Sequence, residues 1–208
     1  MFEIVIFDLE YNTECKLSEI IEVGTFSLCI NTGTYTIERE TNFHSYIKPT
    51  YHPILSNRTI QMTGITQDKV DSADKFDNVY NELVRRYSDN KLYICWGDRD
   101  LKVIHENVTA HNACVYIIDK QNTINLQGIY SAVYGKAMSK KLHEAYTICY
   151  PKKRAENTAH NAVDDAKMTC EIFKSMVCSK IHNDKILPFI KGTQLNNNLK
   201  NHLTKFCK

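Results

Sequence analysis

Two carboxylate side chains follow the first apolar segment of the sequence at a spacing suited to chemistry. Asp8 and Glu10 come directly after the run "FEIVIF" (residues 2–7), and alternation along a strand places both on one face. Neighbouring carboxylates repel each other, and a hard divalent cation such as Mg²⁺ or Mn²⁺, which prefers oxygen ligands, offsets that repulsion. The pair therefore indicates a metal site, or else a strand that simply ends in solvent.

The stretch "YICWGDRDLKVI" carries two further aspartates after an apolar strand. Asp100 has Val103 and Ile104 three and four residues later, so it shares a helix face with residues that pack inward. Asp98 has a leucine and a lysine at those offsets, which is typical of a helix N-cap. Asp100 is thus the one expected near the sheet, the alternative being that both are capping or surface residues.

The stretch "AHNAVDDA" (residues 159–166) places a histidine and two adjacent aspartates at the start of an amphipathic helix expected over 161–177. Asp165 lies at the edge of the apolar stripe of that helix, whereas Asp164 lies on the opposite, charged side. Only Asp165 is therefore expected to point towards the sheet. His160 precedes the helix, and an ordinary pKa of about 6.5 allows a histidine to accept a proton at neutral pH.

Apolar periodicity predicts three early strands, followed by helices that alternate with strands. The expected strands cover residues 2–7, 23–30, 42–49, 91–96 and 114–119. The expected helices cover residues 74–89, 99–108, 125–134, 140–148 and 161–177. This order predicts an α/β domain on a mixed sheet. Glu22, in "SEIIEVG", has two interpretations: a charge at the end of a strand, or a support for the site at Asp8.

Composition indicates a soluble globular chain in a reducing compartment. The 208 residues are 43% hydrophobic and 24% charged, with no apolar run near the roughly 18–20 residues that span a bilayer. The N-terminus lacks the basic region of a signal peptide. The eight cysteines are scattered without a C-x-x-C pair, which favours free thiols over disulfides or a zinc site. We therefore expect a cytoplasmic protein with no membrane partner.

Charge is unevenly distributed along the chain. Residues 179–208 contain six lysines and one aspartate, a net charge of +5, whereas the rest of the chain carries −3. A basic extension on a slightly acidic body suits a protein that handles a polyanion, although a solvated lysine-rich end has the same composition. We divide the chain at this point into a domain of residues 1–178 and an Asn/Lys-rich extension of residues 179–208.

Five residues, taken in order, resemble the active-site set of the DEDDh 3′–5′ exonucleases: Asp8, Glu10, Asp100, His160 and Asp165. The three motifs of this DnaQ-like branch of the ribonuclease H-like fold resemble "FDLEYN", "WGDRDLKVI" and "HNAVDDA" here. The segments "MTGIT", "INLQGIYSAVYG" and "KLHEAY" resemble the stretches between them. The resemblance spans roughly residues 2–177 and is strongest to the group of histone-mRNA 3′ exonucleases and sporulation-inhibitor relatives.

The resemblance implies a ribonuclease H-like mixed sheet of five strands flanked by helices. It implies two Mg²⁺ or Mn²⁺ ions, with Asp8, Glu10 and Asp165 as ligands and Asp100 supporting them directly or through water. One ion would activate water for in-line attack on a phosphodiester and the other would stabilise the leaving 3′-oxygen, with His160 as general base. The product would be a nucleoside 5′-monophosphate.

Two departures from the family pattern bear on how substrate is held. The segment "KKRAENTA" before His160 lacks the glycine often found there, and Tyr11–Asn12 replaces small residues or threonine. Leu9, Tyr11 and Asn12 lie beside the acidic pair and are candidate substrate contacts, with packing in the core or at its rim as the alternative role.

The function predicted is thus a metal-dependent 3′–5′ exonuclease that acts on a single-stranded 3′ end of nucleic acid, with RNA favoured over DNA. Three alternatives remain open. One is a nucleic-acid-binding regulator that keeps the fold without turnover, and another is an oligoribonuclease restricted to very short RNA. The third is an interaction module that needs no metal.

Overall fold

The computed structural model describes residues 1–13, 16–87, 91–113, 117–135, 141–151, 161–178 and 197–206. Its strands form one mixed sheet in the order β4-β3-β2-β1-β5-β6. They are β1 (Phe2–Asn12), β2 (Glu19–Ile30), β3 (Ile37–Lys48), β4 (Asp74–Lys75), β5 (Leu92–Cys95) and β6 (Thr123–Asn125). The pairs β1–β2 and β2–β3 are antiparallel, whereas β5 pairs in parallel with both β1 and β6. The predicted α/β class and mixed sheet are confirmed.

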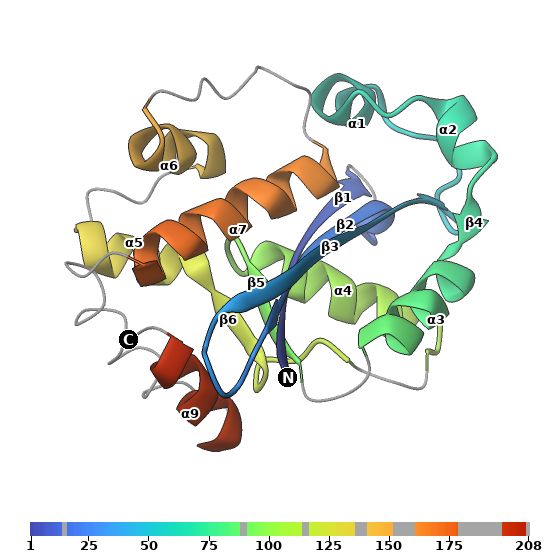
Figure 1. Cartoon of the computed structure of the whole chain (residues 1–208). Helices are drawn as coiled ribbons and strands as arrows, with labels where there is room; N and C mark the ends of the chain where they lie inside the picture. Colours follow the sequence, from blue (N-terminus) through green and yellow to red (C-terminus); the bar gives the residue numbers. More distant parts are fainter. Residues whose placement is uncertain are drawn as a thin grey trace.

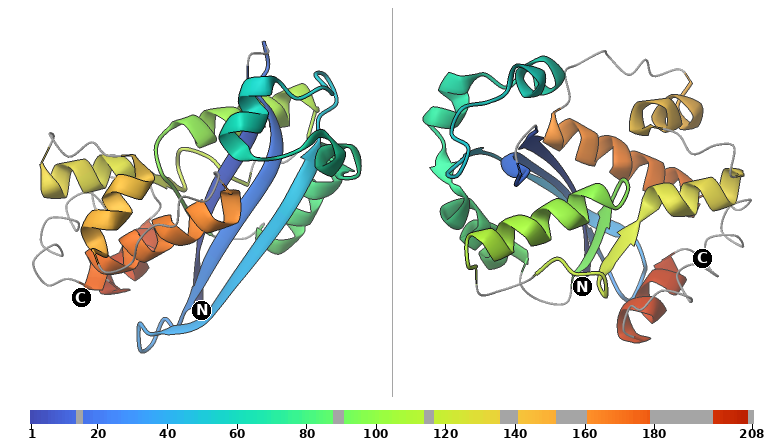
Figure 2. Two further views of the ribbon diagram at one scale, coloured as in Figure 1. Left: turned by 90° about the horizontal axis from the view of Figure 1, so that it is seen from above. Right: turned by 180° about the vertical axis from the view of Figure 1, so that it is seen from behind.

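Helices cover both faces of this sheet (Figures 1 and 2). The helices of the main body are α1 (Asn57–Thr63), α2 (Gln67–Asp71), α3 (Phe76–Tyr87), α4 (Arg99–Ala110), α5 (Leu126–Tyr134), α6 (Leu142–Cys149) and α7 (Ala162–Cys178). Helices α5, α6 and α7 lie on one face, and α3 and α4 lie on the other (Figure 2). The C-terminal extension contributes α9 (Asn197–Phe206). No helix within the described ranges is long and apolar enough to cross a membrane.

Alternation along β1 divides the core into two halves. Ile4 and Ile6 pack with the core on the α5–α7 side, whereas Val5, Phe7 and Leu9 pack with the core beside α3 and α4. Each such side chain contributes about 1.5–3 kcal/mol when fully buried. Because both faces are covered, β1 is fixed in the middle of the molecule, and the face that each of its side chains takes is determined.

Two buried polar residues hold the segment after β3 against the ends of β1 and β2. The Glu19 carboxylate accepts hydrogen bonds from the backbone N–H groups of residues 50–52. The Asn12 amide donates to two backbone carbonyls of the same loop and accepts from Ser56 N and Thr59 Oγ1. Both side chains are almost completely buried. These bonds fix the position of α1 relative to the end of β1.

The structure corrects several boundaries expected from the sequence. β1 continues to Asn12, so Asp8 and Glu10 lie within the strand and not beyond its end. The sheet has a sixth strand, the two-residue β4, which pairs with the end of β3. Short helices α1 and α2 lie between β3 and β4, in a region for which the sequence indicated only that β3 had ended.

The predicted strand 114–119 is wrong for its described part. Residues 117–119 lie outside any strand, and β6 pairs with β5 a few residues later. Ile117 and Ile118 are buried against the α3–α4 side of the core, and the Asn122 side chain binds Ile117 O and Asp119 N across a turn. Apolar character at this point reflects packing and not strand pairing.

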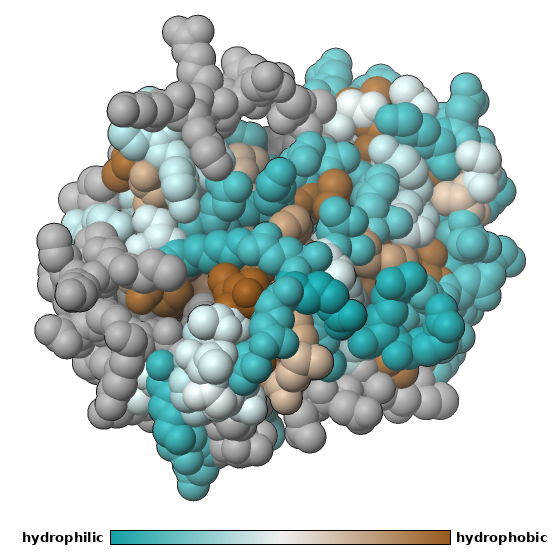
Figure 3. Space-filling view, viewed as in Figure 1, coloured by the Kyte–Doolittle hydropathy of each residue, from teal (hydrophilic) through white to brown (hydrophobic). Residues whose placement is uncertain are grey.

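The face of the molecule in Figure 3 is mostly hydrophilic, with small apolar patches separated by polar side chains. The strand β3 crosses this face and exposes residues 38–42, while β4 pairs only with the last two residues of β3. Charged side chains on such an open edge disfavour pairing with another chain.

Candidate active site

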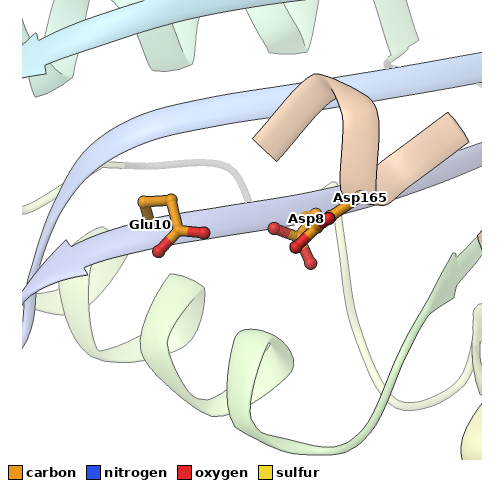
Figure 4. Close-up of side chains that lie close together, drawn as sticks. All are labelled: Asp8, Glu10 and Asp165. Carbon is orange, nitrogen blue, oxygen red and sulfur yellow. The ribbon is translucent and has the colours of Figure 1, made fainter. Parts of the chain in front are cut away.

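Asp8 and Glu10 project from β1 on the side of the sheet that carries α7. Alternation puts them on the face of Ile4 and Ile6, and Figure 4 shows both side chains on one side of the strand. Asp165 reaches the same space from the first turns of α7 (Figure 4). Carboxylate oxygens of Asp8, Glu10 and Asp165 all lie within 4.8 Å of one another. The structure thus brings together three of the residues selected from the sequence.

The start of α7 is held in place by Glu22 of β2. The buried Glu22 carboxylate accepts hydrogen bonds from Ala162 N at 3.1 Å and from Asn161 Nδ2 at 3.2 Å. His44 Nε2 of β3 lies 2.6 Å from Glu22 Oε1, the oxygen that also accepts from Asn161. A negative charge at a helix N-terminus is favourable because the first backbone N–H groups lack partners within the helix. Glu22 therefore supports the site by positioning the helix that carries Asp165.

Gly24 gives α7 the room to approach the sheet. It is the cross-strand partner of Asp8, and a Cβ atom built at Gly24 would lie 2.2 Å from both Ala162 C and Val163 N. Any larger residue here would meet the backbone of the helix and not a movable side chain. The missing side chain lets the first turn of α7 lie beside Asp8.

In each of the two aspartate pairs considered in the sequence, the aspartate expected to face the sheet is buried and the other is exposed. Asp165 is buried and Asp164 is exposed; Asp100 is buried, whereas Asp98 is exposed at the N-cap of α4. Asp98 makes no side-chain capping bond. Asp100 is not one of the three residues whose carboxylate oxygens lie within 4.8 Å of one another. The charge of Asp165 nevertheless raises the pKa of Asp100, so Asp100 borders the cluster.

The carboxylates of the cluster are poorly tolerated as free charges. Burial raises the pKa of Asp8 well above its ordinary value, and the charges of Asp100, Asp165, Glu10 and Glu22 raise it further. Burial, followed by the charge of Asp165, raises the pKa of Asp100 to about 7, against a smaller opposing effect of Arg99. Such a set of hard oxygen donors, unfavourable when charged alone, is the donor set that Mg²⁺ and Mn²⁺ prefer. The residues present therefore fit a divalent-cation site.

A histidine that sequence reasoning did not select also contacts the cluster. His143 Nε2, on α6, lies 3.2 Å from Asp165 Oδ1. It lies in "KLHEAY", which carried no metal or catalytic signal of its own, and only the packing of α6 against α7 brings it to the site. His160, the predicted general base, lies outside the described residues.

The three candidate substrate contacts have different surroundings. Leu9 is buried in the core beside α3 and α4, and Asn12 is buried with its amide bonded to the loop and to α1. These contacts give both residues structural roles and leave their side chains facing protein. Tyr11 is half-buried and lines a cavity together with Glu10, and its role as a substrate contact stays a prediction.

A family model described as exonuclease, the RNase T family, matches residues 5–173, which contain all three motifs. The chain belongs to this exonuclease family. Asp8, Glu10, Asp100 and Asp165 give it the carboxylate order of the DEDDh type.

Relatives of this exonuclease include a probable 3′-5′ exonuclease, KapD, from Bacillus subtilis. It is 25% identical over 195 residues, which cover 93% of this chain and 90% of KapD. Human 3′-5′ exoribonuclease 1 is 41% identical over a shorter stretch of 66 residues, which covers 32% of this chain and 18% of that protein.

Solved structures show the same fold. The nuclease domain of 3′hExo, a DEDDh family member bound to rAMP, superposes on this exonuclease with a TM-score of 0.71. The two are 24% identical, and the match covers 86% of this chain and 94% of that domain. An Exonuclease I structure matches with a TM-score of 0.70 at 13% identity, over 92% of this chain and 43% of that one. The ribonuclease H-like architecture is therefore confirmed at low sequence identity.

The acidic cluster predicts an unusual pH dependence of stability for the metal-free exonuclease. Since the pKa values of Asp8 and Asp100 are raised on folding, the native state holds more protons than the unfolded state between about pH 4 and pH 7. The stability contributed by these two groups therefore falls as pH rises through that window. We expect the melting temperature in EDTA to be lower at pH 8 than at pH 5.5.

Thermal unfolding across this pH range, with EDTA or with excess Mn²⁺, tests the prediction. Cation binding requires ionised ligands, so the stabilisation by Mn²⁺ should increase with pH. A melting temperature in EDTA that rises steadily from pH 5.5 to pH 8 would contradict the assignment of raised pKa values.

Proposed function

We propose that this exonuclease removes nucleotides from the 3′ end of single-stranded nucleic acid, RNA in preference to DNA, and releases nucleoside 5′-monophosphates. The observation that carries the proposal is the meeting of Asp8, Glu10 and Asp165 from β1 and α7 in a chain of the exonuclease family. The 3′–5′ direction and the RNA substrate are supported by relatives named 3′-5′ exonuclease and 3′-5′ exoribonuclease. The activity belongs to the proposed domain of residues 1–178, which contains the matched segment.

Asp8, Glu10 and Asp165 would hold two Mg²⁺ or Mn²⁺ ions, with Asp8 reaching both and Asp100 supporting them directly or through water. When bound, these ions supply an activated water and stabilise the charge on the leaving 3′-oxygen. The protein residues set where the phosphate sits, because β1 is fixed at the centre of the sheet and Glu22 fixes the start of α7.

His160 would accept the proton of the attacking water. Its place directly before α7 in the sequence is that of the histidine in the DEDDh pattern, and a general base contributes about 10²–10⁴-fold to the rate. Tyr11, in the cavity next to Glu10, would contact the sugar or base of the terminal nucleotide.

The deciding experiment uses 5′-labelled single-stranded RNA and DNA oligomers with Mg²⁺, Mn²⁺ or EDTA. A ladder that shortens from the 3′ end and disappears with EDTA is the expected result, with RNA shortened faster than DNA. Activity confined to oligomers of a few nucleotides would instead identify an oligoribonuclease. Intact oligomers in every lane, with a shifted complex still present, would identify a binding protein without turnover.

Replacement of His160 by alanine is expected to lower the rate by about 10²–10⁴-fold, because the water then lacks its general base. The Mn²⁺-induced rise in melting temperature should persist, since the carboxylates are unchanged. The matched variant is His143→Ala, which removes the histidine that contacts Asp165. If His143→Ala shows the large loss of activity and His160→Ala does not, His160 is not the general base.

A further inference from the structure

A cavity of about 500 Å³ adjoins the acidic cluster. It lies between the end of β1, helix α1 and the first residue of α4, and Glu10 forms part of its wall. The remaining walls carry Tyr11, Met62, three threonines and two arginines, Arg58 and Arg99. Glu10 belongs both to the cluster and to this cavity, so the cavity adjoins the place where a phosphate bound at the carboxylates would lie.

Arg99 is exposed and makes two contacts beside this cavity. Its guanidinium carbon lies 5.3 Å from the centre of the Tyr11 ring, and Nη2 donates to Ser18 Oγ at 3.1 Å. Both partners belong to the β1–β2 region that carries the acidic pair. A guanidinium has five N–H donors, so those that Arg99 does not use toward Ser18 and Tyr11 remain for an anion.

Arg58 faces the same cavity from α1. Its side chain is exposed and has no hydrogen-bond, ion-pair or aromatic partner within the part of the chain that the structure describes. Its backbone is nevertheless well anchored, because the neighbouring Thr59 accepts from Thr13 N and donates to Asn12 Oδ1. The guanidinium of Arg58, which has no partner among the described residues, is thus carried by a well-anchored helix beside the acidic site.

Guanidinium groups bind phosphate through paired N–H donors, and an aromatic ring beside them suits a sugar or base. In the proposed function, cations held by the acidic cluster would act on the phosphate that is cleaved. We propose that Arg58 and Arg99 bind a second phosphate of the substrate, next to the scissile one. This inference rests on the proposed function. The second phosphate is either an internucleotide phosphate of the strand or a phosphate on its 3′ end.

Binding of a fluorescent single-stranded RNA oligomer, followed by anisotropy at several salt concentrations, tests the inference. The full chain is used with Asp8→Asn, so that the RNA stays intact. Arg58→Gln and Arg99→Gln should each lower affinity about tenfold and reduce the slope of log K against log salt by about 0.7. Arg85→Gln is the matched control, because Arg85 is exposed on α3 and pairs with Glu82 away from the cavity.

Three oligomers then distinguish the two sources of phosphate. One ends in a 3′-hydroxyl, one in a 3′-phosphate, and one carries an uncharged methylphosphonate at the linkage beside the terminal one. A terminal phosphate is identified if the 3′-phosphate strengthens binding and Arg58→Gln abolishes that gain. An internucleotide phosphate is identified if the methylphosphonate weakens binding and Arg58→Gln adds no further loss.

The inference is overturned if Arg58→Gln and Arg99→Gln bind all three oligomers as the Arg85→Gln control does. The arginines would then only offset the negative charge of the cluster. Failure of the proposed function is a separate result: the enzyme with Asp8 intact would leave RNA uncut, whether or not Arg58 affects binding.

Discussion

Replacement of Asp8 by asparagine is expected to lower the rate of 3′-end hydrolysis by about 10³-fold or more while making the metal-free protein more stable. Asp8 belongs to the acidic cluster, and asparagine keeps its shape but removes the negative charge that cations require. Loss of a single strong electrostatic contact at a reacting centre typically reduces rates by about 10²–10³-fold, and in the proposed mechanism Asp8 would reach both ions. The buried charge of Asp8 is also repelled by Asp100, Asp165 and Glu10. Its removal therefore lowers the electrostatic repulsion in the folded state and stabilises that state.

Initial rates on labelled RNA with Mg²⁺ measure the first effect, and thermal unfolding in EDTA measures the second. Asp164→Asn is the matched control, since Asp164 is the exposed aspartate beside Asp165 and lies outside the cluster. The control should change neither quantity appreciably. An Asp8→Asn enzyme with near-normal activity would exclude Asp8 as a cation ligand. A lower melting temperature of this variant in EDTA would show that the charge of Asp8 does not destabilise the metal-free protein.

Replacement of Gly24 by alanine is the second change with a large expected effect, although it adds only one methyl group. The new Cβ would lie 2.2 Å from backbone atoms of Ala162 and Val163, so either β2 or α7 must move. Overpacking of this kind destabilises a protein by about 3 kcal/mol, which lowers the melting temperature of a chain of this size by about 6–12 °C. Activity should also fall at temperatures where the variant is folded, because α7 carries Asp165.

Gly128→Ala provides the comparison for this variant. Gly128 lies within α5, and a Cβ there would be no closer than 3.8 Å to the Asn125 side chain. An alanine in a helix at such an open position generally stabilises a protein slightly. Equal melting temperatures for Gly24→Ala and the parent protein would show that the helix can withdraw from the sheet without loss, and that its close approach is dispensable.

The residues of the cluster were predictable because local pattern determines which way each side chain points. Strand alternation placed Asp8 and Glu10 on one face, and helix periodicity selected Asp165 over Asp164 and Asp100 over Asp98. These inferences need only a few neighbouring residues. They were confirmed even though β1 proved longer than expected and the cluster lies within the strand.

Other parts of the site depend on contacts between distant segments, which no local pattern reports. Glu22 lies 140 positions from Ala162, whose N–H it binds, and its role was open until α7 was placed. The contact of His143 with Asp165 likewise requires the packing of α6 on α7. The strand expected at 114–119 failed for a related reason, since a buried apolar run looks the same whether it pairs in a sheet or packs on helices.

The anchoring of α7 by Glu22 has a consequence for the synthesis of the protein. A nascent chain that has left the ribosome only as far as residue 150 carries Asp8, Glu10 and Asp100, yet it lacks the helix that closes the site. Contacts of such long range form late in folding because the intervening chain must first be ordered. An enzyme that degrades nucleic acid from its end is thereby kept inactive until the segment that forms α7 has been translated.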